Sequence, residues 1–155
     1  MIQRIQSVYL SLVFLLSLLF LKGSFLSFAE KSGSVIKITF SGIIRDSGLL
    51  GTEQIGKTWL LAIFIILIPI ISLITILLFK KRKVQLWFSL TLILIIAGFI
   101  GIAFYYSWFV ITNYRADLVP EIKIILMPVI LIFAILAYRG IKKDDNLVKS
   151  YDRLR

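Results

Sequence analysis

Four long apolar runs, separated by polar and charged segments, dominate the pattern along the chain. The clearest covers residues 59–79, 21 positions without a charge. At about 1.5 Å per residue, a helix of this length crosses the roughly 30 Å hydrocarbon layer of a bilayer. A second uncharged run extends from Val84 to Tyr114, and its part over 86–106 predicts another membrane-spanning helix.

The fourth and first runs are shorter. Fifteen uncharged residues lie between Lys123 and Arg139, and because the stems of these side chains can snorkel toward the headgroups, a spanning helix over 124–138 is predicted. The first run predicts a helix over 5–21, with an alternative in which a longer, tilted helix continues to residue 28. The pattern predicts an all-α membrane protein with four transmembrane helices in a single membrane domain.

The start of the chain also fits a cleavable secretory signal. Arg4, the apolar stretch 8–21 and Ser27-Phe28-Ala29 resemble the charged start, the core and the cleavage site of such a signal. Against this interpretation, Lys22 and two Phe residues separate the apolar stretch from the supposed site. Both interpretations leave the following segment on the outer side of the membrane.

The segments between the runs carry weaker signals. In an outer loop over 22–58, Ile36, Ile38 and Phe40 alternate with polar neighbours, which is typical of a short strand. Turn residues punctuate the apolar stretch that follows, so a small β-hairpin is predicted in this loop. The remaining segments are expected to be a basic inner turn over 80–85, an outer loop over 107–123 and a cytoplasmic amphipathic tail over 139–155.

The distribution of charge predicts the orientation. The chain is 59% apolar with a formal net charge of +10 and a mean hydropathy of +0.98. Eleven of its 18 Lys and Arg residues fall in the short segments assigned to the inside, and such segments stay cytoplasmic, so both termini are predicted inside. Because the basic residues flank apolar runs instead of lining one face of a soluble module, no nucleic-acid partner is expected.

Residues at the ends of the predicted helices are candidates for contact with the lipid bilayer. Three tryptophans fall near predicted membrane surfaces, where an amphipathic ring is favoured: Trp59, Trp87 and Trp108. Five basic residues are expected at the inner headgroups: Arg4, Lys80, Lys81, Arg82 and Lys83.

The third predicted helix and the tail hold candidates for protein contacts. Ala97, Gly98 and Gly101 form a small-residue patch that permits close helix packing, within the chain or with a second copy. In the tail, Asp144, Asp145 and Asn146 are candidate helix caps. They precede one apolar stripe at helical spacing, Leu147, Val148, Tyr151 and Leu154. The stripe fits either a short interfacial helix or the docking of another membrane or cytoplasmic protein.

The two ends and the inner turn carry a family resemblance. The start MIQRIQSVYL, the turn KKRKVQ at 80–85 and the ending RGIKKDDNLVKSYDRLR at 139–155 resemble a four-span inner-membrane protein family of unknown function from the Bacteroidota. The resemblance covers the whole chain and implies that the first run remains as a helix in a bacterial inner membrane. It supplies no activity, and it directs attention to the cytoplasmic face.

The residue types narrow the function. The chain has no Cys and no His, which removes thiolate nucleophiles, the commonest general base and the usual ligands of zinc and haem, so no cofactor and no enzymatic activity is predicted. The leading hypothesis is a non-enzymatic accessory or assembly component of a membrane complex. The alternative is a small transporter or channel without titratable intramembrane residues, motivated by prolines at 69 and 128 within two of the spans.

Overall fold

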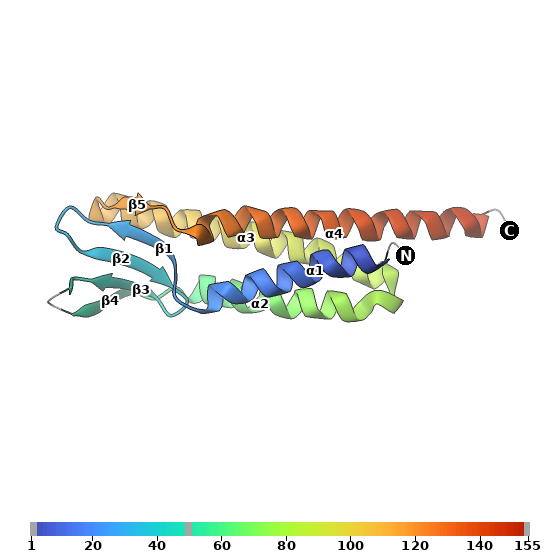
Figure 1. The fold of residues 1–155 in the computed structure, drawn as a ribbon, viewed down its shortest axis with the longest axis horizontal. Helices are drawn as coiled ribbons and strands as arrows, with labels where there is room; N and C mark the ends of the chain where they lie inside the picture. Colours follow the sequence, from blue (N-terminus) through green and yellow to red (C-terminus); the bar gives the residue numbers. More distant parts are fainter. Residues whose placement is uncertain (1–2, 49–50, 154–155) are drawn as a thin grey trace.

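A computed structural model describes residues 3–48 and 51–153, with side chains for residues 5–48 and 51–147. Four helices run back and forth along its long axis, and an antiparallel sheet lies at one end (Figure 1). We call this the sheet end, and the opposite end, near which both chain termini lie, the terminal end. The helices are α1 (Gln3–Leu18, followed by the 3-10 turn η1, Leu19–Leu21), α2 (Trp59–Leu77, followed by η3, Leu78–Lys80), α3 (Arg82–Tyr114) and α4 (Ile122–Arg153).

Each helix packs against two neighbours, so that the four form a ring in which α1 and α3 each contact both α2 and α4. The buried positions recur at alternating steps of three and four residues. These seams contain Leu10, Val13 and Ser17 in α1, Leu61, Ile65 and Ile68 in α2, Leu92, Ile96 and Phe99 in α3, and Ile130, Ala134 and Ala137 in α4. Such spacing produces the coiled-coil-like packing that is usual in four-helix bundles.

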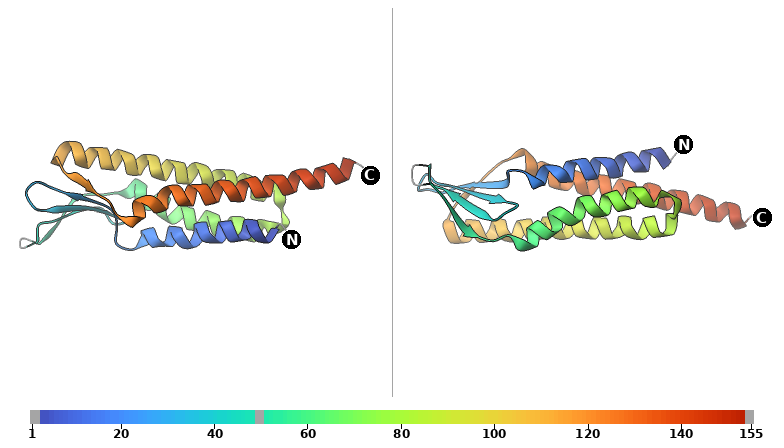
Figure 2. Two further views of the ribbon diagram at one scale, coloured as in Figure 1. Left: turned by 45° about the horizontal axis from the view of Figure 1, so that its top comes forward. Right: turned by 90° about the horizontal axis from the view of Figure 1, so that it is seen from below.

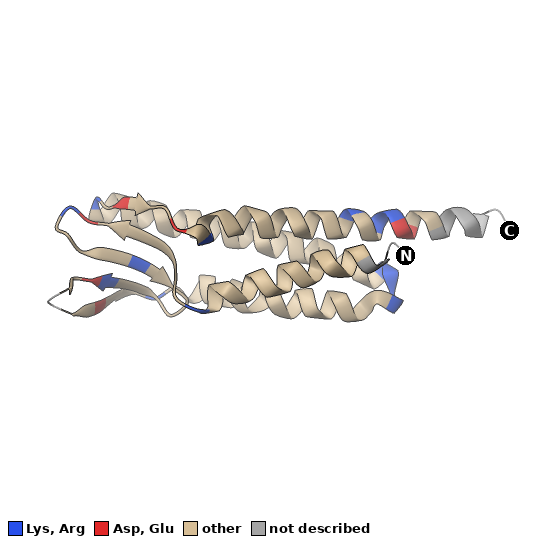
Figure 3. Ribbon diagram, in the orientation of Figure 1, with Lys and Arg blue, Asp and Glu red and all other residues tan. Residues whose placement is uncertain are grey.

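The outward surface of the bundle is also apolar. The segments Trp59–Lys80, Arg82–Tyr114 and Ile122–Leu147 are long and apolar enough to cross a membrane, and only 28–33% of their most apolar stretches is buried. The apolar part of α1 with η1, Ile5–Leu21, is shorter. Charged residues gather toward the two ends and leave a long uncharged middle (Figure 3). Three apolar helices of this length are typical of a membrane protein.

The sheet corrects the prediction of an all-α protein with one hairpin. Five antiparallel strands follow the order β4-β3-β2-β1-β5, and they form a layer that continues the bundle axis (Figure 2). The strands are β1 (Ser24–Ala29), β2 (Val35–Thr39), β3 (Ile43–Asp46), β4 (Thr52–Gly56) and β5 (Asp117–Val119). The predicted hairpin is present as β2 and β3, and β1 joins it to β5, with Phe28 opposite both Ile36 and Leu118.

Two boundaries at the sheet end differ from the sequence prediction. The alternative of a first helix that continues to residue 28 is wrong, because Ser24–Ala29 is strand β1. The predicted outer loop 107–123 is helical in its first half, because α3 continues to Tyr114 and buries Val110 in the core. The uncharged run Val84–Tyr114 thus forms one continuous helix.

The predicted tail is not a separate helix. α4 runs without a break from Ile122 to Arg153, and Asp144 and Asp145 lie within it, so they do not cap a helix. Gly140 alone does not interrupt the run, because one glycine costs only about 1 kcal/mol in a helix and this one lies against α1, where a Cβ would be 2.9 Å from Gln6 Cγ.

Packing and hydrogen bonds attach the sheet to the bundle. The rings of Phe20, Phe25 and Phe99 form a cluster with centroid separations of 5.5–6.5 Å, which joins η1, β1 and α3. Glu121, just before α4, accepts hydrogen bonds from two serine hydroxyls of β1. The hydroxyl of Thr58, just before α2, donates to the Thr39 carbonyl at 3.1 Å. The sheet is therefore fixed to three sides of the helical ring.

Two carboxylates on the sheet make ion pairs. Glu30 accepts hydrogen bonds from Ser34 and Arg45. These bonds hold the pKa of Glu30 below its ordinary value of 4.5, and the bond from Ser34 has the largest effect. Lys37 Nζ lies 3.0 Å from Asp46 Oδ2 and keeps the pKa of Asp46 below 3.8. The first pair joins the turn after β1 to β3, and the second joins β2 to β3.

We expect these carboxylates to make the sheet sensitive to acid. A carboxyl group whose pKa is lower in the folded state than in the unfolded state stabilises the fold. This stabilisation is fully present above the unfolded-state pKa and is lost as the pH falls through the folded-state pKa. Glu30→Gln should therefore reduce amide protection in β1 and β2 at about pH 7. Between about pH 7 and about pH 3, the protection in this variant should fall less steeply than in the wild type. Hydrogen exchange measures this, with the exposed Glu53→Gln as the matched control. Identical pH profiles for Glu30→Gln and the wild type would contradict the expectation.

Candidate functional site

Three segments far apart in the sequence meet at the terminal end: the start of α1, the turn between α2 and α3, and the later part of α4 (Figure 1). They are also the segments that carry the family resemblance. Here each helix places at least one buried polar residue in its seam, among them Gln6, Thr75, Gln85 and Asp144. We call these four residues the terminal polar layer.

Side-chain amides hold the layer together in two pairs. Gln6 Nε2 donates a hydrogen bond to Asp144 Oδ2 at 2.7 Å, which joins α1 to α4. Gln85 Nε2 donates to the Thr75 carbonyl at 3.1 Å, which joins α3 to α2. Arg82 Nη1 donates a longer bond of 3.5 Å to the backbone carbonyl of Asp144. Among the described residues, every buried side-chain nitrogen and oxygen has a partner, so the layer is satisfied internally.

The space beside the layer is small. A cavity of about 10 Å³ is lined by Gln6, Arg82, Gln85 and Asp144, a volume that holds roughly one water molecule. Substrate pockets usually measure about 300–1,000 Å³. Polar groups at core positions of a helical bundle fix the register and the choice of neighbouring helix. The layer is therefore suited to locking the two ends of the chain together, and not to holding a substrate.

The surface around the layer is basic. Among the residues whose side chains the structure describes, six exposed cations surround this end, and we call them the basic rim: Lys80, Lys81, Lys83, Arg139, Lys142 and Lys143. Asp144 and Asp145 are each only 8% exposed. Because these two carboxylates are turned into the protein, the charge presented to the surroundings by this part of the chain is cationic.

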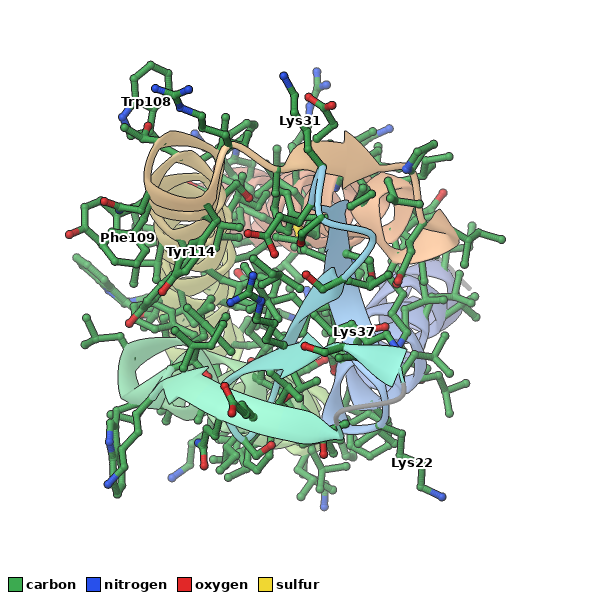
Figure 4. All side chains as sticks on the ribbon, turned by 90° about the vertical axis from the view of Figure 1, so that its left-hand side faces the viewer. Lys22, Lys31, Lys37, Trp108, Phe109 and Tyr114 are labelled. Atoms are coloured by element: carbon green, nitrogen blue, oxygen red, sulfur yellow. The ribbon has the colours of Figure 1, made fainter. Side chains whose placement is uncertain are left out.

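The three tryptophans predicted at the membrane surfaces are all exposed, Trp59 and Trp87 by 69% and Trp108 by 73%. Trp87 and Trp108 lie 21 residues apart on α3, about 31 Å along a helix, close to the roughly 30 Å thickness of the hydrocarbon layer. Seen from the sheet end, Trp108 projects outward from α3 (Figure 4). The side chain of Arg4, also predicted at the membrane surface, lies outside the described residues.

Of the three small residues predicted to pack, only Gly98 lies against a neighbour. A Cβ at Gly98 would be 2.8 Å from Phe64 Cε1 of α2, whereas nothing lies within 4 Å of one at Gly101. Ala97 is exposed. The three residues therefore do not form one contact, because the seam of α3 passes through Ile96 and Phe99 and leaves positions 97 and 101 on the outer side.

The predicted docking stripe lies mostly beyond the part of the chain whose side chains are described. Leu147, its first residue, is 43% exposed on α4. The side chains of Val148, Tyr151 and Leu154 fall outside the described residues, although α4 itself continues to Arg153. The first three stripe residues, up to Tyr151, thus lie on the same continuous helix as the apolar segment before them.

Sequence reasoning missed Gln6 and Gln85 as candidate site residues. Both lie at the margin of an apolar run, where a glutamine is easily taken for a headgroup contact. The usable signal is their seam spacing, because Gln6 lies four residues before Leu10 and Gln85 seven residues before Leu92.

The fold and the site together define a membrane-type four-helix bundle with a sheet at one end and the terminal polar layer at the other. The chain belongs to a family described as a domain of unknown function, DUF4293, which matches residues 2–154. The match agrees with the predicted membership of a family of unknown function. No curated protein and no solved structure is significantly similar to the chain.

Proposed function

We propose that the chain is a non-enzymatic component of a bacterial inner-membrane complex that spans the membrane four times and docks a partner through the cytoplasmic end of α4. The observation that carries the proposal is the course of α4, which continues past the terminal polar layer and projects beyond the start of α1 (Figure 1). The bond from Gln6 to Asp144 anchors the base of this projection. A helix with one apolar stripe is a common docking element.

The placement of charge supports an orientation with both termini in the cytoplasm. The basic rim surrounds the terminal end, whereas the sheet end mixes acids such as Glu30, Asp46 and Glu121 with its cations. Short basic segments remain cytoplasmic, so the sheet is assigned to the outer side. In this proposal α1 is the fourth span, and it is retained, because cleavage after Ala29 would remove strand β1 from between β2 and β5.

The interior of the bundle favours docking over transport. Transport requires a path lined by polar groups or by water. A void between the described parts of the helices, lined by Ser17 and seven apolar residues, measures about 10 Å³. The Ser17 hydroxyl donates to the Phe14 carbonyl at 2.8 Å, so it is occupied within its own helix. A measurable solute flux through proteoliposomes would reverse this preference.

Crosslinking in the native membrane tests the docking proposal. A chain that ends at Leu147 keeps Asp144 and its bond to Gln6, so the loss of a partner would report on the tail and not on a broken bundle. The triple variant Val148→Ala/Tyr151→Ala/Leu154→Ala removes the three stripe side chains beyond Leu147 and keeps the rest of the tail. We expect both changes to lower the yield of the crosslinked partner roughly tenfold or more, the factor that about 1.4 kcal/mol produces.

The matched control removes the polar face of the same helix, in the variant Lys149→Ala/Asp152→Ala/Arg153→Ala. If the stripe docks a protein, this control retains the crosslinked partner. If the tail is instead an interfacial helix held by anionic headgroups, the control detaches the tail from the membrane and neither triple variant changes the crosslinks. That second pattern would contradict the proposal.

A further inference from the structure

A groove of about 420 Å³ lies at the sheet end, between the start of α2 and the sheet. Its part toward the middle of the bundle is lined by Ala62, Ile63 and Ile66, and its part toward the sheet by Ser41, Gln54 and Lys57. The groove is therefore apolar at one end and polar, with one cation, at the other.

The polar end of the groove is organised by contacts within the sheet. Gln54 Nε2 donates to the Ser41 carbonyl at 3.2 Å, which joins two residues of the lining. Lys57 is exposed, and its Nζ lies 5.8 Å from the centre of the Trp59 ring. The Thr58 hydroxyl is directed to the Thr39 carbonyl, so Lys57 is the charged group that the lining offers to a ligand.

The depth of the groove matches a membrane surface. Trp59 opens α2 and is exposed, as expected for an anchor at the headgroup level. Ile63 and Ile66 follow it by four and seven residues, which places them about 6–10 Å deeper along the helix. The groove thus begins among the headgroups and ends in hydrocarbon.

A second groove gives an internal comparison. It has about 410 Å³, lies between α3 and α4, and is lined by residues that include Phe104, Trp108 and Pro128 but no charged side chain. The two grooves have nearly equal volumes, but this second groove has no cation that could bind an anionic headgroup. A charged side chain in the lining is therefore the feature that distinguishes the groove beside Trp59.

We propose that the groove beside Trp59 binds one anionic phospholipid of the outer leaflet, with its phosphate at Lys57 and one acyl chain along Ala62, Ile63 and Ile66. Its volume falls in the range of about 300–1,000 Å³ that is usual for ligand sites. An ammonium group is a point charge suited to phosphate, and the exposed indole covers the junction of headgroup and chain. The proposal rests on the proposed membrane placement and is independent of docking through α4.

Native mass spectrometry of the full chain tests the proposal after reconstitution into vesicles of equal phosphatidylglycerol and phosphatidylethanolamine and extraction in mild detergent. We expect one retained lipid per chain, with phosphatidylglycerol retained about five times more often than phosphatidylethanolamine. This factor corresponds to the free energy of attraction of about 1 kcal/mol between one basic side chain and an anionic lipid surface. Lys57→Gln should abolish the enrichment, and Ala62→Leu, which fills the groove, should abolish retention.

Matched controls separate the groove from general effects. Lys31→Gln removes an exposed lysine at the far tip of the sheet, where Figure 4 shows it projecting away from the bundle. Ala97→Leu makes the same enlargement at an exposed position of α3. Both should behave as the wild type. Because Lys57 is exposed, its replacement leaves the fold intact even if Ala62→Leu does not, so unchanged enrichment in Lys57→Gln overturns the proposal. The tail variants should retain the lipid, so failure of docking and failure of lipid binding remain distinguishable.

Discussion

Replacing Gly98 with leucine is expected to destabilise the bundle by about 1–3 kcal/mol, the usual cost of overpacking a tight contact. A Cβ at this position would already lie 2.8 Å from Phe64 Cε1, and the Phe64 ring packs against the core, so the larger side chain must displace this ring or the two helices. Gly101→Leu is the matched control on the same helix, because nothing lies within 4 Å of a Cβ there.

Thermal unfolding in detergent measures the difference between the two variants. The structure predicts a lowered midpoint for Gly98→Leu and an unchanged or raised one for Gly101→Leu, since leucine is the better helix former. Equal destabilisation of both would mean that α3 presents a different face to α2.

Gln6→Leu is expected to cost about 1.5–3 kcal/mol, because it leaves the buried Asp144 carboxylate without its amide donor. The bond measures 2.7 Å, and Gln6 and Asp144 are 5% and 8% exposed. Asp144→Leu should cost a similar amount by leaving the amide unpaired. The double variant Gln6→Leu/Asp144→Leu should recover part of the loss, because replacing both partners by apolar groups can be nearly neutral.

A double-mutant cycle with the same unfolding assay quantifies this coupling. Residues in direct contact usually couple by about 0.5–3 kcal/mol. If the two single effects simply add, Gln6 and Asp144 do not interact and the two ends of the chain are not locked together at the terminal end. Asn146→Leu, at an exposed position on α4, controls for adding leucine to this helix.

The helices could be predicted because their signal is local. The run 59–79 is recognisable from its own length and lack of charge, and α2 with η3 occupies Trp59–Lys80. The strand at Ile36 and Ile38 was predictable for the same reason, since its alternation lies within a few neighbouring residues and both side chains are buried.

The full sheet could not be predicted because its pairing is distant in sequence. In the sequence, the residues of β1 resemble the end of an apolar run. They form a strand by pairing with β2 on one side and with β5 on the other, where Ser27 lies opposite Val119. β5 has three exposed residues, too few to show a period of two.

The terminal polar layer was hidden for a related reason. Gln6 and Asp144 are 138 positions apart, and each alone resembles a polar residue at the end of an apolar helix. Their resemblance to the ends of a known family directed attention to the correct face, but only the arrangement of the four helices brings the two side chains together. The outward faces of the helices are also apolar, so the sequence does not distinguish them from the buried seams. Gln6 and Gln85 could therefore not be recognised as buried from their positions.

The most direct test of the proposed account is the side of the membrane on which each end lies. The chain has no Cys, so single-cysteine variants Lys31→Cys, on the sheet, and Asn146→Cys, on α4, can be labelled with a membrane-impermeant maleimide. We expect Lys31→Cys to be labelled in spheroplasts and Asn146→Cys to be labelled only after the membrane is opened. Labelling of Asn146→Cys in intact spheroplasts would contradict the four-span arrangement with a cytoplasmic docking helix.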